Sequence, residues 1–222
     1  MTQDEQKRAA AERAVSMLPR GEIIGVGTGS TVNHFISALD SIKHDIRGAV
    51  VTSQETEKRL RQLGIPIVSP AEAGRLSVYV DGADEINHSL QMIKGGGGAL
   101  LAEKIVASIA DTFICIADES KYVSKLGKFP LPIEVAPFAR SVVAKSLIRM
   151  GGTPQLRMGF TTESGHEILD TSGLDLSRPL TMEDEINQIA GVMDNGLFAR
   201  RPADVLVLAN KNGVEIISIG TR

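Results

Sequence analysis

Short apolar runs alternate with segments of helical periodicity through the first 120 residues, and this alternation most limits the folds open to the chain. The run at 23–26 is bounded by glycines, which predicts a buried strand, and apolar side chains at 32, 35, 36 and 39 then follow at helical spacing. Further strands are predicted at 49–51, 67–68, 77–80, 92–93 and 112–117, with a helix at 99–110. Strand–helix alternation predicts a parallel sheet with helices on both faces, which binds ligands beyond the carboxyl ends of its strands.

The texture of the sequence changes near residue 127. Pro130, Pro132 and Pro137 predict an extended crossing segment, and two helical segments with strand-like stretches between them follow. Two apolar runs at 204–208 and 214–219, joined by Asn212-Gly213, predict a hairpin that returns to the first domain. We therefore expect a main α/β domain over 1–127 plus 203–222 and a small α+β domain over 128–202.

Composition excludes several classes of function. The 222 residues carry a net charge of −3 and contain no long basic run, which argues against nucleic acid as a partner. No apolar run is long enough to span a bilayer, and the charged start lacks the apolar core of a signal peptide. Cys115 is the single cysteine, so no intrachain disulfide can form. These features predict a cytoplasmic protein.

Two glycine-rich segments are typical of anion sites. The first, 25–31, links the first strand to its helix, and its Thr28, Gly29, Ser30 and Thr31 suit phosphate oxygens. It lacks both the P-loop ending and the third glycine of the dinucleotide fingerprint, which favours a phosphate monoester over a nucleotide. A tight structural turn remains the alternative. The second segment has Lys94 followed by four glycines and then Glu103 in a predicted helix, so bare N–H groups would face an anion at the positive helix end.

Carboxylates and lysines follow two of the other predicted strands. Asp81 and Asp84 lie just past the run at 77–80, where they could bind a polyol, join a metal site, or only form a turn and a helix cap. We predict no metal, because the four histidines are scattered without ligand spacing. Lys121 follows the run at 112–117 and could complete an anion site or simply be solvated.

With these motifs assembled, the chain resembles the A-type ribose-5-phosphate isomerase family. The resemblance covers nearly the whole chain and is carried by the segments 25–31, 81–87, 94–103, 121–132 and 195–199. It implies interconversion of ribose 5-phosphate and ribulose 5-phosphate without a cofactor, by a homodimer or homotetramer. It also implies a Rossmann-like main domain with a ferredoxin-like small domain. The segment 165–171 departs from the family, which usually has asparagine at the position of His166 and valine at that of Thr171.

The resemblance also implies roles for the site residues. Glu103 would be the general base that moves a proton between two adjacent carbons through an enediolate. Asp81 and Asp84 would hold sugar hydroxyls, and Asp81 with Lys94 would open the furanose ring. Charge on the enediolate would be stabilised by Lys94, Gly95, Gly96 and Gly97. The remaining contacts to substrate are assigned to Thr28, Gly29, Ser30, Thr31, Gly82, Ala83 and Lys121.

Two other classes of function stay open at this point. A non-catalytic sugar-phosphate sensor should lack the base and carry a DNA-binding domain, whereas this chain retains Glu103 and has no room for such a domain. A sugar-phosphate deaminase or a coenzyme A transferase of related architecture would be an enzyme with different chemistry. The sequence leaves open the kinetic constants, the choice between dimer and tetramer, and the tolerance for other sugar phosphates.

Overall fold

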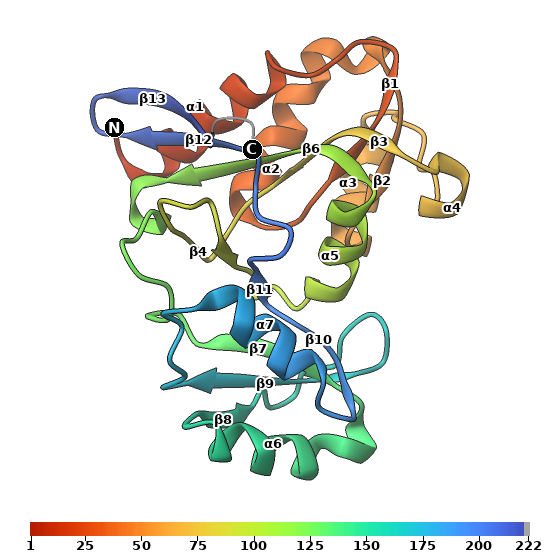
Figure 1. Ribbon diagram of the computed structural model, residues 1–222. Coiled ribbons are helices and arrows are strands. Elements are labelled where there is room, and N and C mark those ends of the chain that lie inside the picture. Colours follow the sequence, from red (N-terminus) through yellow and green to blue (C-terminus); the bar gives the residue numbers. More distant parts are fainter. Residues whose placement is uncertain (220–222) are drawn as a thin grey trace. The chain divides into compact units, whose positions relative to one another are not determined.

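A computed structural model describes residues 1–219 of the chain (Figure 1). Contacts divide these residues into two compact units. The larger unit comprises Met1–Ala83, Ala102–Tyr122 and the residues from Ala203 onward, and the smaller unit comprises Asp84–Leu101 and Val123–Pro202. This division differs from the ranges expected from the sequence, because it assigns 84–101 and 123–127 to the smaller unit. Part of the reason is that the buried carboxylate of Glu85 accepts hydrogen bonds from the backbone N–H groups of Gly127 and Phe129.

The larger unit is built on a six-stranded sheet in the order β13-β12-β6-β3-β1-β2. All neighbours pair in parallel except the terminal hairpin of β12 and β13, which is antiparallel. Figure 1 shows β12 beside β6, so the hairpin returns to the first sheet as predicted. The strands are β1 (Glu22–Val26), β2 (Ile46–Val51), β3 (Leu76–Asp81), β6 (Ala110–Asp118), β12 (Val205–Asn210) and β13 (Gly213–Ser218).

Alternation along the strands gives the sheet two faces, each covered by helices. Side chains such as Val26, Val80 and Ile116 share a core with α1 and α2. Residues at the alternate positions of the same strands face the opposite side of the sheet. There Tyr79 packs on Phe113 with ring centroids 4.7 Å apart, and a Cβ at Gly25 would touch both Tyr79 and Val106 of α5. The helices are α1 (Gln3–Val15), α2 (Ser30–Leu39), η1 (Asp40–Asp45), α3 (Gln54–Gln62), α4 (Pro70–Ala73), α5 (Leu100–Ser108) and η2 (Glu119–Lys121).

The smaller unit contains a β-α-β-β-α-β arrangement whose antiparallel sheet has the order β10-β7-β9-β8. This is the ferredoxin-like pattern that the resemblance implied. A second sheet, β11-β5-β4, consists of two-residue strands. The elements are β4 (Glu85–Ile86), β5 (Met92–Ile93), β7 (Leu131–Val135), η3 (Pro137–Ala139), α6 (Arg140–Arg149), β8 (Thr153–Leu156), β9 (Glu167–Ser172), α7 (Pro179–Asn187), β10 (Val192–Asn195) and β11 (Leu197–Phe198).

The fold class predicted from the sequence is confirmed: a mainly parallel α/β sheet with a smaller α+β part. One local prediction was wrong, because the 67–68 run makes only an isolated bridge to Ala49. Helix α3 is capped by Ser53, whose hydroxyl accepts from the N–H of Thr56. The proline-rich segment is extended as expected, and it contains β7, an interior strand of its sheet that the sequence did not indicate.

The turn at the departing segment 165–171 closes with local hydrogen bonds. Gly165 adopts a φ of +82° and donates its N–H to the carbonyl of Thr162. His166 donates its backbone N–H to the Thr162 hydroxyl, and its Nδ1 lies 2.9 Å from the buried carboxylate of Glu134. Thr171 is buried in β9. The two unusual side chains are therefore accommodated within the smaller unit.

Candidate active site

Asp81 is a fully buried carboxylate at the carboxyl end of β3, and it accepts hydrogen bonds within the larger unit. Its Oδ1 accepts the N–H groups of Thr28, at 3.1 Å, and Gly82, at 2.7 Å. Its Oδ2 accepts the hydroxyl of Tyr79. Donors of this kind hold a carboxylate in one orientation and compensate for its burial. The structure thus brings together the 28–31 loop and the 81–83 segment that the sequence singled out separately.

Gly27 gives Asp81 its space. A Cβ at Gly27 would lie 1.9 Å from Cγ of Asp81, far inside van der Waals contact. The N–H of Gly27 meanwhile donates to the carbonyl of Val80 and fixes the loop against β3. Only glycine at this position lets the loop backbone approach the Asp81 carboxylate so closely. This requirement goes beyond the tight structural turn that the sequence left open as the alternative.

Glu103 lies in the first turn of α5, where the positive end of the helix dipole favours a carboxylate, and only 3% of the residue is exposed. Tyr79 connects this carboxylate electrostatically with Asp81. Burial raises the pKa of the Tyr79 phenol well above its usual range, and the nearby charges of Asp81 and Glu103 raise it further. The phenol therefore stays protonated and remains a donor to Asp81. Three ionisable groups are thus gathered on one face of the sheet.

The 28–31 loop, predicted to bind an anion, has a cation beside it that the sequence did not indicate. Lys7 of α1 places its Nζ 3.1 Å from the hydroxyl of Ser30. The same helix contacts the turn that carries Lys121, because Gln6 exchanges hydrogen bonds with the side chain and the N–H of Glu119. Neither contact has a signal in the sequence, since 23 residues separate Lys7 from Ser30 and 113 residues separate Gln6 from Glu119.

The remaining predicted residues belong to the smaller unit. Asp84 donates its N–H to the carbonyl of Ile93 and accepts the N–H of Gly96 through Oδ2 at 2.8 Å. Lys94 is 3% exposed and holds its Nζ 5.6 Å from the centroid of Phe198. The glycine segment was expected to bring bare backbone N–H groups close to a bound anion. In the structure the N–H of Gly96 instead binds Asp84, and that of Gly98 closes a turn onto Gly95.

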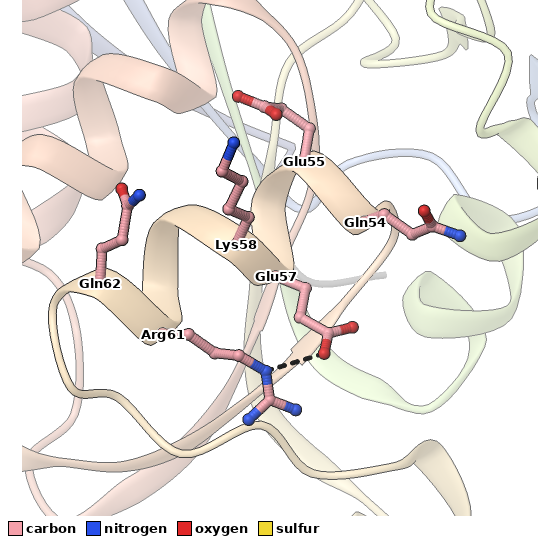
Figure 2. Close-up of a pocket in the computed structure, with 6 residues that line it drawn as sticks. All are labelled: Gln54, Glu55, Glu57, Lys58, Arg61 and Gln62. Atoms are coloured by element: carbon pink, nitrogen blue, oxygen red, sulfur yellow. Dashed lines mark hydrogen bonds and ion pairs between the residues drawn. The ribbon is translucent and has the colours of Figure 1, made fainter.

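A pocket over α3 contains none of the predicted residues. Figure 2 shows its lining, which is Gln54, Glu55, Glu57, Lys58, Arg61 and Gln62. Glu57 and Arg61 form an ion pair one turn apart at 2.8 Å. All six side chains come from one polar helix, so the pocket presents mixed charge and no convergent chemistry.

Within residues 1–219 no group of three or more histidine, cysteine, aspartate or glutamate side chains is arranged to hold a metal ion. Over the same residues no helix combines the length and the apolarity needed to cross a bilayer.

Comparison with known proteins identifies relatives over almost the whole chain. Ribose-5-phosphate isomerase A of Neisseria meningitidis serogroup C is 59% identical over 216 residues, covering 97% of each chain. The crystal structure of ribose 5 phosphate isomerase A from Neisseria gonorrhoeae is 58% identical, with a TM-score of 0.96 over 98% of this chain and 97% of that one. A D-ribose-5-phosphate isomerase solved in complex with phospho-erythronic acid is 36% identical, with a TM-score of 0.94 over 99% and 100%.

The family model gives the same result. A model described as ribose 5-phosphate isomerase A (phosphoriboisomerase A) matches residues 48–213, which is well over half of the chain. The resemblance drawn from the motifs is therefore confirmed, and the chain belongs to the ribose 5-phosphate isomerase A family.

Proposed function

We propose that this protein interconverts D-ribose 5-phosphate and D-ribulose 5-phosphate through an enediolate, with Glu103 as the general base. Relatives named for this isomerase that match 97% of the chain support the reaction over the sensor, deaminase and transferase alternatives. The observation that carries the mechanism is the burial of Glu103 in the first turn of α5. Glu103 lies close enough to the buried Tyr79 that its charge, like that of Asp81, raises the pKa of the Tyr79 phenol. The test is conversion of ribose 5-phosphate by the purified protein.

The chemistry needs one base that reaches two adjacent carbons. Glu103 takes the proton from C2 of the aldose and returns it to C1, while the hydroxyl proton passes from O2 to O1, and together these transfers yield the ketose; the reverse reaction uses the same carboxylate. Its burial reduces competition from water, and its place in the first turn of α5 puts it at the positive end of the helix dipole. Charge that develops on the oxygens of the enediolate is stabilised by Lys94 and by the backbone N–H groups of Gly95 and Gly97. Gly96 contributes to the same sugar-binding segment, with its own N–H donated to Asp84.

The remaining site residues bind the ends of the sugar. Thr28, Gly29, Ser30, Thr31 and Lys121 hold the phosphate, and Lys7 adds a second positive charge through its place beside Ser30. Asp81 and Asp84, with Gly82 and Ala83, hold hydroxyls, and Asp81 with Lys94 opens the furanose ring. In support, the Asp81 carboxylate is fixed in one orientation by Tyr79, Thr28 and Gly82.

Phospho-erythronic acid offers a direct probe of this site. Its carboxylate carries negative charge on two oxygens attached to one carbon, much as an enediolate carries charge on neighbouring oxygens. A relative has been solved in complex with it. If the site is complementary to the charged intermediate, this acid inhibits competitively against ribose 5-phosphate.

Gly27→Ala is expected to lower kcat/KM for ribose 5-phosphate by about 100-fold, because the added Cβ displaces the Asp81 carboxylate by an ångström or more. The measurement is steady-state kinetics beside a thermal unfolding curve, which separates a local displacement from loss of the fold. A folded variant with the kcat/KM of the wild type would contradict the assigned role of Asp81.

Exhaustive chelation is expected to leave turnover unchanged within a factor of about two, since every step is assigned to side chains and backbone N–H groups. The check is the rate of ribose 5-phosphate conversion before and after dialysis against EDTA. A loss of turnover that magnesium or zinc restores would show that Asp81 and Asp84 bind a metal rather than sugar hydroxyls.

The assembly is proposed to be a homodimer or homotetramer in the cytoplasm. In support, Phe138 of η3 is fully exposed and Val142 of α6, four residues later, is 62% exposed, which leaves apolar surface for a second copy of the chain. Cys115 is buried and is the single cysteine of the chain, as suits a reducing compartment. Light scattering on the eluted protein should give two or four times the mass of one chain, and a monomer at micromolar concentration would contradict the proposal.

A further inference from the structure

Arg157 lies directly after β8 in the smaller unit and is held rigidly there. Its Nε and Nη2 donate to the two carboxylate oxygens of Asp170, at 2.9 and 2.6 Å, in a two-point ion pair. The two side chains are only 18% and 27% exposed. Its backbone N–H also donates to the carbonyl of Ile168 in β9. A bidentate pair of this kind fixes the plane of the guanidinium.

The third guanidinium nitrogen reaches the glycine segment, about sixty residues earlier in the chain. Nη1 donates to the carbonyl of Gly95 at 3.1 Å and to that of Gly96 at 3.2 Å. Phe160 supports the same arrangement, because its ring centroid lies 5.3 Å from the guanidinium carbon. The ring also fills the space at Gly98, where a Cβ would come within 2.1 Å of it.

These contacts determine which way the glycine N–H groups point. In a planar trans peptide the C=O and the following N–H point in opposite directions. With the carbonyls of Gly95 and Gly96 directed at Arg157, the N–H groups of Gly96 and Gly97 face away from it. The N–H of Gly96 accordingly donates to Asp84 at 2.8 Å. The segment is thus held by a cation on its carbonyl side and by a carboxylate on its N–H side.

We propose that Arg157 is a positioning residue for the substrate loop 94–97, which it holds with the N–H groups of Gly96 and Gly97 turned toward the Asp84 side. The inference rests on the proposed function, because that function assigns these glycines to the sugar and the enediolate. Four consecutive glycines have wide conformational freedom, so a loop made of them needs an external restraint to stay preorganised. The guanidinium supplies that restraint by donating to two carbonyls at once. A lysine ammonium, at the end of a flexible stem, would do so with far less directional control.

The test compares Arg157→Lys with the matched control Arg140→Lys. Arg140 also pairs with a carboxylate of the smaller unit, because its Nη1 donates to the two carboxylate oxygens of Glu167 at 3.0 and 3.2 Å, away from the 94–97 loop in the sequence. Arg157→Lys is expected to lower kcat/KM for ribose 5-phosphate by about 10- to 100-fold, with part of the loss in kcat, and to weaken inhibition by phospho-erythronic acid. Arg140→Lys should stay within about twofold of the wild type.

Amide hydrogen exchange reads the loop without relying on turnover. The peptide that contains 94–98 should exchange faster in Arg157→Lys and at the wild-type rate in Arg140→Lys. If Arg157→Lys fails to fold, Asp170→Asn retains the guanidinium while weakening its anchor, and it should show the same faster exchange.

Two results would overturn the inference: unchanged exchange at 94–98 in a folded Arg157 variant, or equal effects of both lysine substitutions on kinetics and on the melting temperature. A wild-type protein that leaves ribose 5-phosphate unchanged would instead refute the proposed function, while the exchange measurement would still decide whether Arg157 orders the loop.

Discussion

Glu103→Gln is expected to leave the fold intact and to lower kcat by about 100- to 10,000-fold, the usual contribution of a general base. Glutamine matches glutamate in size, so the packing of α5 is preserved while the proton-carrying group is lost. KM should change little, because the proposed contacts to phosphate and hydroxyls come from other residues. The measurement is steady-state kinetics in both directions, with a thermal unfolding curve to show that the variant is folded.

Glu134→Gln is the matched control for this substitution. Glu134 is as buried as Glu103, and its Oε1 accepts from the hydroxyl of Thr162 at 2.9 Å, which a glutamine oxygen can also do. The control should keep kcat within a few-fold of the wild type even if it lowers the melting temperature. A Glu103→Gln enzyme with half the normal kcat would show that another residue is the base.

Ribose without its phosphate is expected to be a very poor substrate, with kcat/KM lower by about 100- to 10,000-fold. Each hydrogen bond to a charged group contributes about 1.5–3 kcal/mol, and at least two such bonds to the phosphate are assigned to the 28–31 loop and Lys121. Because this binding energy orients the sugar over Glu103, kcat should fall together with affinity. The measurement compares both sugars at equal concentration.

Thr31→Ala and inorganic phosphate probe the same site from the protein and the ligand side. The substitution should raise KM for ribose 5-phosphate more than it lowers kcat, and inorganic phosphate should compete weakly. Similar rates on ribose and ribose 5-phosphate would mean that the glycine-rich loop serves the fold alone.

The features predictable from the sequence were those with a local physical signature. Apolar runs such as 23–26 and 112–117 become interior strands of the parallel sheet because their side chains are needed on both of its faces. Asp81 could be placed at the carboxyl end of β3 because it directly follows such a run. Gly27 could be singled out as a turn residue, but its tight packing against the Asp81 carboxylate becomes visible only once β1 and β3 are paired.

The features missed were those created by contacts distant in sequence. Strands β4 and β11 have two residues each, which is too short to show a period, and they form only by pairing with β5, the strand predicted at 92–93. Strand β7 was not predicted because the prolines at 130 and 132 argue against an interior strand. In the structure β7 nevertheless pairs with β9 on one side and β10 on the other. No local motif singled out three residues that matter through their contacts, namely Lys7, Tyr79 and Arg157. Their hydrogen bonds to Ser30, Asp81 and Gly95 are visible only in the folded chain.

The most direct test of the account is isomerisation in D₂O, followed by NMR at the reacting carbons with the wild type and with Glu103→Gln. A carboxylate that removes and returns the proton exchanges it with solvent during the lifetime of the enediolate, so the wild type should place deuterium at C1 of ribulose 5-phosphate. Glu103→Gln should lose deuterium incorporation and turnover in the same proportion. Conversion without any deuterium incorporation would indicate direct hydride transfer. Incorporation at the wild-type rate in Glu103→Gln would show that the base lies elsewhere, and either result would contradict the account.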